Sequence, residues 1–219
     1  MSTLVLTLVT GVGLGALYFL VASGLSLIYG LMHVLNFAHG AFLTLSAFMG
    51  WFVAQALGTD SWGSFLLSIL VGAVVGAVFA TLTELVLIRP LYERHIEQVL
   101  VTVGLSLAAV ALFEGMWGTD AITIAGPPWL TQTTEILGAR IPNKYWVLIV
   151  AAGLVLLALV LFLQKTRYGM VIRAGVENRA MVTALGIDVR RSFTLVFAIG
   201  GAAAGIGGVM AMHYTNYVS

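Results

Sequence analysis

No acidic residue, lysine or arginine precedes Asp60, so the chain opens with an uncharged stretch that a soluble core could not hide. An α-helix crosses a bilayer with about 20 apolar residues, and this stretch has room for two crossings. Over its 219 residues the chain is 60% hydrophobic and 9% charged, whereas soluble domains carry about 25% charged residues. A surface of this composition must face hydrocarbon. The sequence therefore predicts an all-α polytopic membrane protein.

Polar or charged segments divide the chain into six apolar runs, and we expect each run to form one transmembrane helix within a single transmembrane domain, residues 1–219. The third run ends at Arg89-Pro90, because the residue before a proline is disfavoured in a helix. The first run lacks the lysine or arginine of a cleavable signal peptide, so we expect it to be retained. The predicted spans are Leu4–Tyr29, Ala41–Leu57, Trp62–Ile88, Val99–Trp117, Trp146–Leu163 and Phe193–His213.

Segment 30–40, GLMHVLNFAHG, separates the first two runs without carrying a full charge. Backbone that leaves the helix at membrane depth must be buried in protein or line a wet cavity. A short turn and a re-entrant segment both fit this requirement. Asn36 and His39 would either line a cavity or hold the freed backbone groups through local hydrogen bonds.

Segment 164–191, QKTRYGMVIRAGVENRAMVTALGIDVRR, separates the last two spans and holds six of the ten basic residues. Cytoplasmic loops carry an excess of lysine and arginine, so we place this segment in the cytoplasm. Loop 89–98 is then also cytoplasmic, whereas loop 118–145 and the N-terminus are outside. A re-entrant segment near 30–40 would reverse the N-terminus. The six basic residues are Lys165, Arg167, Arg173, Arg179, Arg190 and Arg191.

Residues from Arg173 to Leu185 favour a short helix under the membrane, and Gly186 is a helix stop. Tethered to a span at each end, such a helix could pass a push from a cytoplasmic partner to both spans. The alternative is a charged loop that only sets the topology and touches anionic lipid. The residues of the predicted apolar face are Ala174, Met181, Ala184 and Leu185.

No residue pattern indicates catalysis, a cofactor or a metal. The chain has no cysteine, and its four histidines have no metal-ligand spacing. It lacks the Walker loop, G-x-x-x-x-G-K followed by Ser or Thr, so any ATP would be hydrolysed by another protein. Glu84 and Glu114 lie near span ends without a second acid, and we expect each to be a snorkelling or paired interfacial residue. The net charge of +1 does not indicate a nucleic-acid partner.

Several motifs, in the same order along the chain, resemble permease subunits of ABC importers for branched-chain amino acids. The first is Gly24–Gly40, GLSLIYGLMHVLNFAHG, with NFAHG as its sharpest part. The second is RPL at Arg89–Leu91, preceded by Glu84. The remaining motifs are YG at Tyr168, RA at Arg173, NRAMVTALGI at 178–187 and FAIGGAAAGIGGV at 197–209. The resemblance therefore covers most of the chain.

This resemblance implies a multi-pass subunit of the bacterial inner membrane that is not itself an enzyme and imports branched-chain amino acids. The implied partners are a second, homologous permease subunit packed through small-residue helix faces, two ATP-binding cassette subunits that hydrolyse ATP, an extracytoplasmic solute-binding protein and membrane lipid. The residues expected to couple to an ATP-binding subunit are Arg173, Glu177, Asn178, Arg179, Ala180, Leu185 and Gly186. Those expected along the translocation path are Asn36, Phe37, His39 and Gly40.

Members of this family normally continue with further spans, so we expect this chain to be a fragment or a shortened copy without the C-terminal spans. Three alternatives remain open. The first is a related importer of urea or short amides. The second is a membrane enzyme acting on a lipid or polyprenyl substrate, for which Glu93, Arg94, His95 and Glu97 are the polar candidates. The third is a structural membrane subunit without a transport role.

Overall fold

The computed structural model describes residues 2–58, 61–92, 94–124, 126–177, 179–184, 186 and 189–218. Six of the described helices are long and apolar enough to cross a membrane, which confirms the predicted all-α polytopic fold class. Each predicted span lies within one of these helical stretches, the third of which is Trp62–Leu91. The six are α1 (Ser2–Met32), α2 (His39–Leu57), α3 (Trp62–Thr83), α4 (His95–Trp117), α6 (Asn143–Lys165) and α9 (Val189–Thr215). The span that begins with α3 continues through a π-helix, η1 (Glu84–Ile88), and a 3-10 helix, η2 (Arg89–Leu91).

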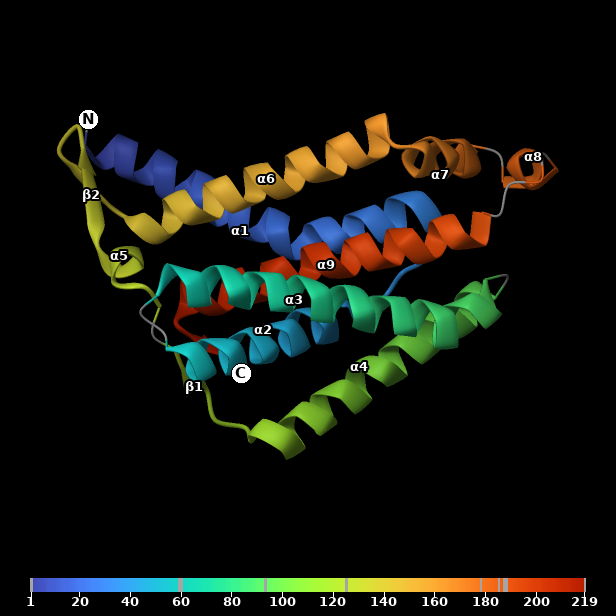
Figure 1. The fold of residues 1–219 in the computed structure, drawn as a ribbon, viewed down its shortest axis with the longest axis horizontal. Coiled ribbons are helices and arrows are strands. Elements are labelled where there is room, and N and C mark those ends of the chain that lie inside the picture. The colour runs from blue at the N-terminus through green and yellow to red at the C-terminus, as the bar shows by residue number, and fades with distance from the viewer. Residues whose placement is uncertain are drawn as a thin grey trace.

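The connections between the spans gather at two ends of the bundle (Figure 1). One end holds the turn from η2 into α4 and two short helices, α7 (Arg167–Glu177) and α8 (Arg179–Ala184). We name this the inner end, following the excess of basic residues there. The opposite, outer end holds the start of α1 and the segment between α4 and α6. This sharing of ends by loops 89–98 and 164–191 matches the predicted alternation of the spans.

The outer-end segment contains short helix α5 (Pro128–Thr131) and two small antiparallel sheets. Strands β2 (Thr133–Ile136) and β3 (Ala139–Pro142) form a hairpin that leads into α6. Strand β1 (Ile122–Thr123) pairs with β4 (Tyr217–Val218), which follows α9. This pairing joins the outer-end segment to the end of the most buried span.

Helix α9 lies at the centre of the bundle, because 67% of its apolar window is buried, against at most 39% for any other span. Its glycines bring its backbone directly against three other spans. A Cβ added at Gly201 would overlap the Gly76 carbonyl of α3, and one at Gly208 would overlap the Leu43 carbonyl of α2. A Cβ at Gly200 would lie 2.9 Å from the carbonyl oxygen of Gly24 in α1. Close approach through small residues is how helices associate in lipid, where apolar surface gains little from burial.

The small-residue face of α9 is therefore occupied within the chain and does not face a second subunit. Gly11 and Gly15 of α1, in contrast, have no atom within 4 Å of an added Cβ. Both positions are exposed. This pair therefore leaves an open small-residue face on the outer half of α1, and Gly30 is open in the same way nearer the inner end.

Helix α2 begins deep inside the bundle and not at the inner end. His39, its first residue, donates a hydrogen bond from Nε2 to the carbonyl oxygen of Val21 at 2.9 Å. Val21 precedes the end of α1 at Met32 by roughly 16 Å of helix, at 1.5 Å per residue. Residues 33–38 therefore run back along α1 in a non-helical conformation before α2 starts. In Figure 1, α2 likewise stops farther from the inner end of the bundle than α3 and α9 do.

Candidate functional site

The connection 33–38 is non-helical, with buried and exposed residues in alternation, and Asn36 makes local hydrogen bonds to its backbone. The side-chain Oδ1 of Asn36 accepts a hydrogen bond from the Ala38 amide at 3.1 Å, and the Asn36 carbonyl accepts from the His39 amide at 3.2 Å. Asn36 is 2% exposed and His39 is 6% exposed. The sequence left two interpretations of Asn36 and His39 open: they line a cavity, or they bind the freed backbone groups through local hydrogen bonds. These contacts favour the second interpretation. The segment connects two full spans, so it is a recessed connection.

The His39 ring is packed as well as hydrogen-bonded. Gly24 leaves room for it, since a Cβ at Gly24 would lie 3.0 Å from His39 Cε1. The ring also contacts Phe42 edge-on, with the centroids 6.1 Å apart. One imidazole thus fixes the start of α2 against the middle of α1.

We expect His39→Ala to lower the free energy of unfolding by about 1–2 kcal/mol, because the Val21 hydrogen bond and the packed ring are both lost. The measurement is an unfolding titration of the purified protein in mixed micelles. His95→Ala removes an exposed imidazole and is the matched control. Equal stability of the two variants would contradict the role assigned to His39.

The other two predicted path residues lie on the outside of this connection. Phe37 is 51% exposed, and Gly40 is exposed with open space around it. Gly40 lines a groove of about 240 Å³ between α2 and α4. The structure therefore separates the four predicted path residues into a buried pair and an exposed pair. The groove is lined by Gly40, Ala41, Thr44, Phe48, Ser106, Val110, Phe113, Glu114 and Gly118.

The groove, which we call the α2–α4 groove, mixes apolar and polar groups and leads inward from the outer end. Glu114 and Gly118 lie at the outer end of α4, where Glu114 is exposed. Thr44 and Ser106 place hydroxyl groups deeper in the groove. One turn further in, Thr102 Oγ1 donates to the carbonyl oxygen of Leu35 at 3.5 Å, and Thr102 is fully buried. The recessed connection thus closes the inner end of the groove.

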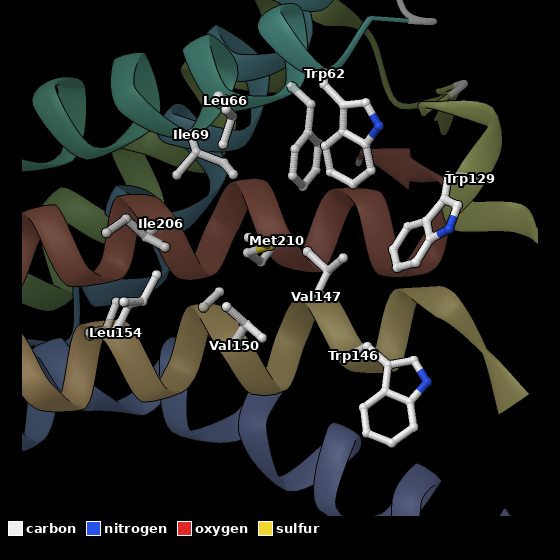
Figure 2. A pocket seen from close by; sticks show the side chains of 13 residues that line it. Trp62, Leu66, Ile69, Trp129, Trp146, Val147, Val150, Leu154, Ile206 and Met210 are labelled. Atoms are coloured by element: carbon white, nitrogen blue, oxygen red, sulfur yellow. The ribbon is translucent and has the colours of Figure 1, made fainter. Parts of the chain in front are cut away.

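A second cavity, of about 400 Å³, lies between α3, α6 and α9 and is entirely apolar (Figure 2). Trp62, Trp129 and Trp146 gather at its outer end. Aromatic residues favour the level of the membrane interface. The remaining lining residues include Leu154, Ile206 and Met210. This cavity offers no group that would bind the charged ends of an amino acid.

At the inner end, α7 and α8 replace the single helix predicted over 173–185, and α7 begins six residues earlier than predicted. The start is fixed by Thr166, whose Oγ1 donates to the Phe162 carbonyl at 2.6 Å and accepts from the Gly169 amide at 3.0 Å. Gly186 has φ +78°, which fits the predicted helix stop. We name residues 167–186 the inner helical segment.

The residues of the predicted apolar face lie on the exposed side of this segment. Ala174, Met181 and Ala184 are exposed, whereas Ile172 is fully buried and Val182 is 5% exposed. The exposed positions leave an apolar and charged outer surface, to which Arg173 and Glu177 also belong.

The buried side of the inner helical segment reaches the recessed connection. Ile172 and Val182 belong to one core cluster with Val34, Ala38 and Phe193. The segment therefore packs against α9 and shares this cluster with residues of the recessed connection. Of the other predicted coupling residues, Asn178 and Leu185 lie outside the described residues, as do the side chains of Arg179 and Ala180 in α8.

Glu84 departs from its prediction as an interfacial acid, because it is fully buried. The Thr194 hydroxyl donates to its Oε2 at 2.8 Å, and the Tyr92 hydroxyl donates to its Oε1. Sequence reasoning missed these contacts because Thr194 lies 110 residues away. The polar residues considered for a membrane enzyme include an exposed ion pair between Arg94 and Glu97, with the nitrogen and oxygen 3.2 Å apart. Glu93 lies outside the described residues.

These features define a class: a multi-pass membrane protein with a partly polar groove between two spans and a helical surface at its inner end. The chain belongs to the family described as the branched-chain amino acid transport system permease component, whose model matches residues 7–219. It is thus a transport permease of the inner membrane, as the motifs in its sequence implied. No solved structure matches it.

Relatives from three organisms are similar over most of the chain. The permease protein LivH of the high-affinity branched-chain amino acid transport system of Escherichia coli K12 is 29% identical over 208 residues, covering 91% of this chain and 68% of LivH. BraD of Pseudomonas aeruginosa, named for the same kind of system, is 27% identical over 211 residues, or 93% of this chain and 69% of BraD. A probable LivH of Methanocaldococcus jannaschii is 28% identical over 195 residues, or 86% of this chain and 60% of that protein.

Proposed function

We propose that this chain is the permease subunit of an ABC importer that carries branched-chain amino acids into the cell, driven by ATP hydrolysis on partner subunits. Its family supports the transport role, and the names of its relatives support the substrate. The observation that carries the mechanism is the position of the inner helical segment. Its outer surface is exposed, and its buried side belongs to the same hydrophobic cluster as the connection that closes the α2–α4 groove.

The inner helical segment acts as the coupling segment in this proposal. An ATP-binding cassette subunit docks on its exposed surface, with Arg173, Glu177 and the apolar Met181 as contacts. A second such subunit docks on a second, homologous permease. Closure of the two ATP-binding subunits pushes the segment, and the push reaches residues 33–38 through Ile172 and Val182. The predicted contacts Asn178, Arg179, Ala180, Leu185 and Gly186 remain part of this proposed surface.

The α2–α4 groove is the outer half of the translocation path. The aliphatic side chain of the substrate would lie on Val110 and Phe113, and its polar ends would meet the hydroxyls of Thr44 and Ser106. Glu114 at the mouth attracts the ammonium group, because opposite charges attract. Gly40 lines the base, Phe37 flanks it, and Asn36 and His39 hold the connection that closes it. Moving this connection opens the groove inward.

A solute-binding protein would dock at the outer end, over residues 118–142, and release substrate beside the mouth of the groove. Most of the selection among amino acids then lies with that protein. A groove lined by small, apolar and hydroxyl-bearing residues accepts aliphatic amino acids as a class. Membrane lipid surrounds the apolar faces of the spans, and the open Gly11 and Gly15 face of α1 suits the second permease subunit.

The docking proposal is tested with Glu177→Cys, since the chain has no cysteine of its own. Glu177 is exposed at the end of α7. A thiol-linked photoreactive probe there should crosslink to the ATP-binding subunit in membranes, at least fivefold more in one nucleotide state than in the other. Leu137→Cys, 78% exposed in the outer-end hairpin, is the control and should give no such product. Labelling of Glu177→Cys from outside the cell, or labelling from inside without a crosslink, would refute the proposal.

A further inference from the structure

Glu84 is an acid placed where a membrane span leaves α-helical geometry. It is fully buried, and it opens the π-helix η1 inside the span Trp62–Leu91. Ionisable groups buried in a membrane span are costly and mark functional positions. Single π-helical turns likewise occur mainly at functional sites. Glu84 does not line the proposed transport path, so we looked for a separate role for it.

The Glu84 carboxyl joins three parts of the inner end. Each of its oxygens accepts one hydrogen bond from a hydroxyl group. The donors are Tyr92, in the turn before α4, and Thr194, in the second turn of α9. The Tyr92 ring also packs edge-on against Phe193, with the centroids 5.6 Å apart. Hydrogen bonds to a charged acceptor are about twice as strong as neutral ones. One side chain thus holds the end of α3, the turn into α4 and the start of α9 together.

The start of α9 is the point where movement of the inner helical segment would arrive. Helix α8 ends at Ala184 and α9 begins at Val189, five residues before Thr194. Farther along, α3 and α9 meet backbone to backbone, because added Cβ atoms at Gly201 and Gly205 would overlap the carbonyls of Gly76 and Gly72. This contact holds the two helices together near their middle. The Glu84 bridge adds the connection at the end where the force is applied.

We propose that Glu84 is the positioning residue that transmits movement of the inner helical segment from α9 to α3. This proposal rests on the proposed function. Glu84 touches neither substrate nor nucleotide. It acts through Thr194 and Tyr92, so that α9 and α3 move as one body when the ATP-binding subunits close. Without the bridge, ATP hydrolysis continues but less of it leads to transport.

The test uses the complete importer, reconstituted in proteoliposomes with its second permease, ATP-binding subunits and solute-binding protein. The readout is labelled leucine taken up per ATP hydrolysed. We expect Glu84→Gln to lower this ratio about tenfold, with ATP hydrolysis within twofold of wild type. Thr194→Val, which keeps the shape of the side chain and removes one hydroxyl, should lower it about threefold. The controls are Glu97→Gln, an exposed acid at the same end, and Thr81→Val, whose hydroxyl bonds only within α3.

A second readout separates this inference from the proposed function. Spin labels at Leu82 on α3 and Tyr168 on α7, both more than half exposed, report the distance between the two elements. In wild type this distance should stay unchanged between nucleotide states, and in Glu84→Gln it should change by several ångströms. The role of Glu84 would be overturned if the uptake ratio stayed unchanged in both Glu84→Gln and Thr194→Val. It would also be overturned if both variants failed to assemble and lost uptake and hydrolysis together. No ATP-dependent leucine uptake by the wild-type importer would overturn the proposed function instead, while the label distances would still decide whether Glu84 ties α3 to the segment.

Discussion

Gly201→Val is expected to remove most of the folded protein from the membrane. An added Cβ at Gly201 would overlap the carbonyl oxygen of Gly76 and the Cβ of Ala80. Overpacking a core already costs about 1–3 kcal/mol when side chains can yield. Here the obstacle is the backbone of α3, which cannot turn aside, and the whole stability of a typical domain is only about 5–15 kcal/mol. Because α9 also contacts α1 and α2 through glycine, moving it away from α3 would break those contacts too.

The measurement is size-exclusion chromatography of the detergent-solubilised protein, followed by a thermal melt of any monodisperse fraction. Gly104→Val is the matched control, because Gly104 lies on α4 with no atom within 4 Å of an added Cβ. The control should elute as wild type and melt within a few degrees of it. A monodisperse Gly201→Val protein with a wild-type melting temperature would show that α9 does not need its close contact with α3.

The existence of the six spans could be predicted from the sequence because the bilayer sets their length. A run of about 20 apolar residues is long enough to cross the bilayer as a helix. Each predicted span lies within one described helical stretch. The ends were less predictable. Helix α4 begins at His95, four residues before the predicted Val99, because charged and polar side chains at a helix end can extend into the interface.

The arrangement of the spans was not predictable in the same way. In a soluble helix the apolar stripe identifies the buried face, but a span is apolar on its lipid side as well. Glycine content was the signal that remained. Gly200, Gly201, Gly205 and Gly208 lie in one helix and meet three other spans. A span with small residues on several faces therefore indicates a central position.

The inner end shows where local geometry overrode the sequence pattern. The prediction for Ala174 and Met181 assumed one helix, but the two residues lie in different helices, α7 and α8, and both are exposed. Glu84 was expected near Arg89 at the interface, but the π-helix between them changes which way each side chain points. A π-helix has no residue signature, so neither change could be found from propensity or spacing.

Ser106→Trp should reduce leucine uptake by the complete importer at least tenfold while leaving the fold intact. Ser106 lines the α2–α4 groove and is only partly buried, so a larger side chain can enter the groove without displacing the core. The groove volume of about 240 Å³ is small enough for one indole to take up most of it. Substrate released at the outer end would then find its route closed above the level where Thr102 contacts Leu35.

The control for this substitution is its neighbour, Leu107→Trp, because Leu107 is 68% exposed on the lipid side of α4 and the same indole there does not enter the groove. Both variants should melt near the wild-type temperature, and ATP hydrolysis in both should persist, since the inner helical segment is untouched. Wild-type uptake by Ser106→Trp would place the path on another face of the molecule. An equal loss of uptake in both variants would mean that α4 serves packing against a partner, because the groove is lined by Ser106 and not by Leu107.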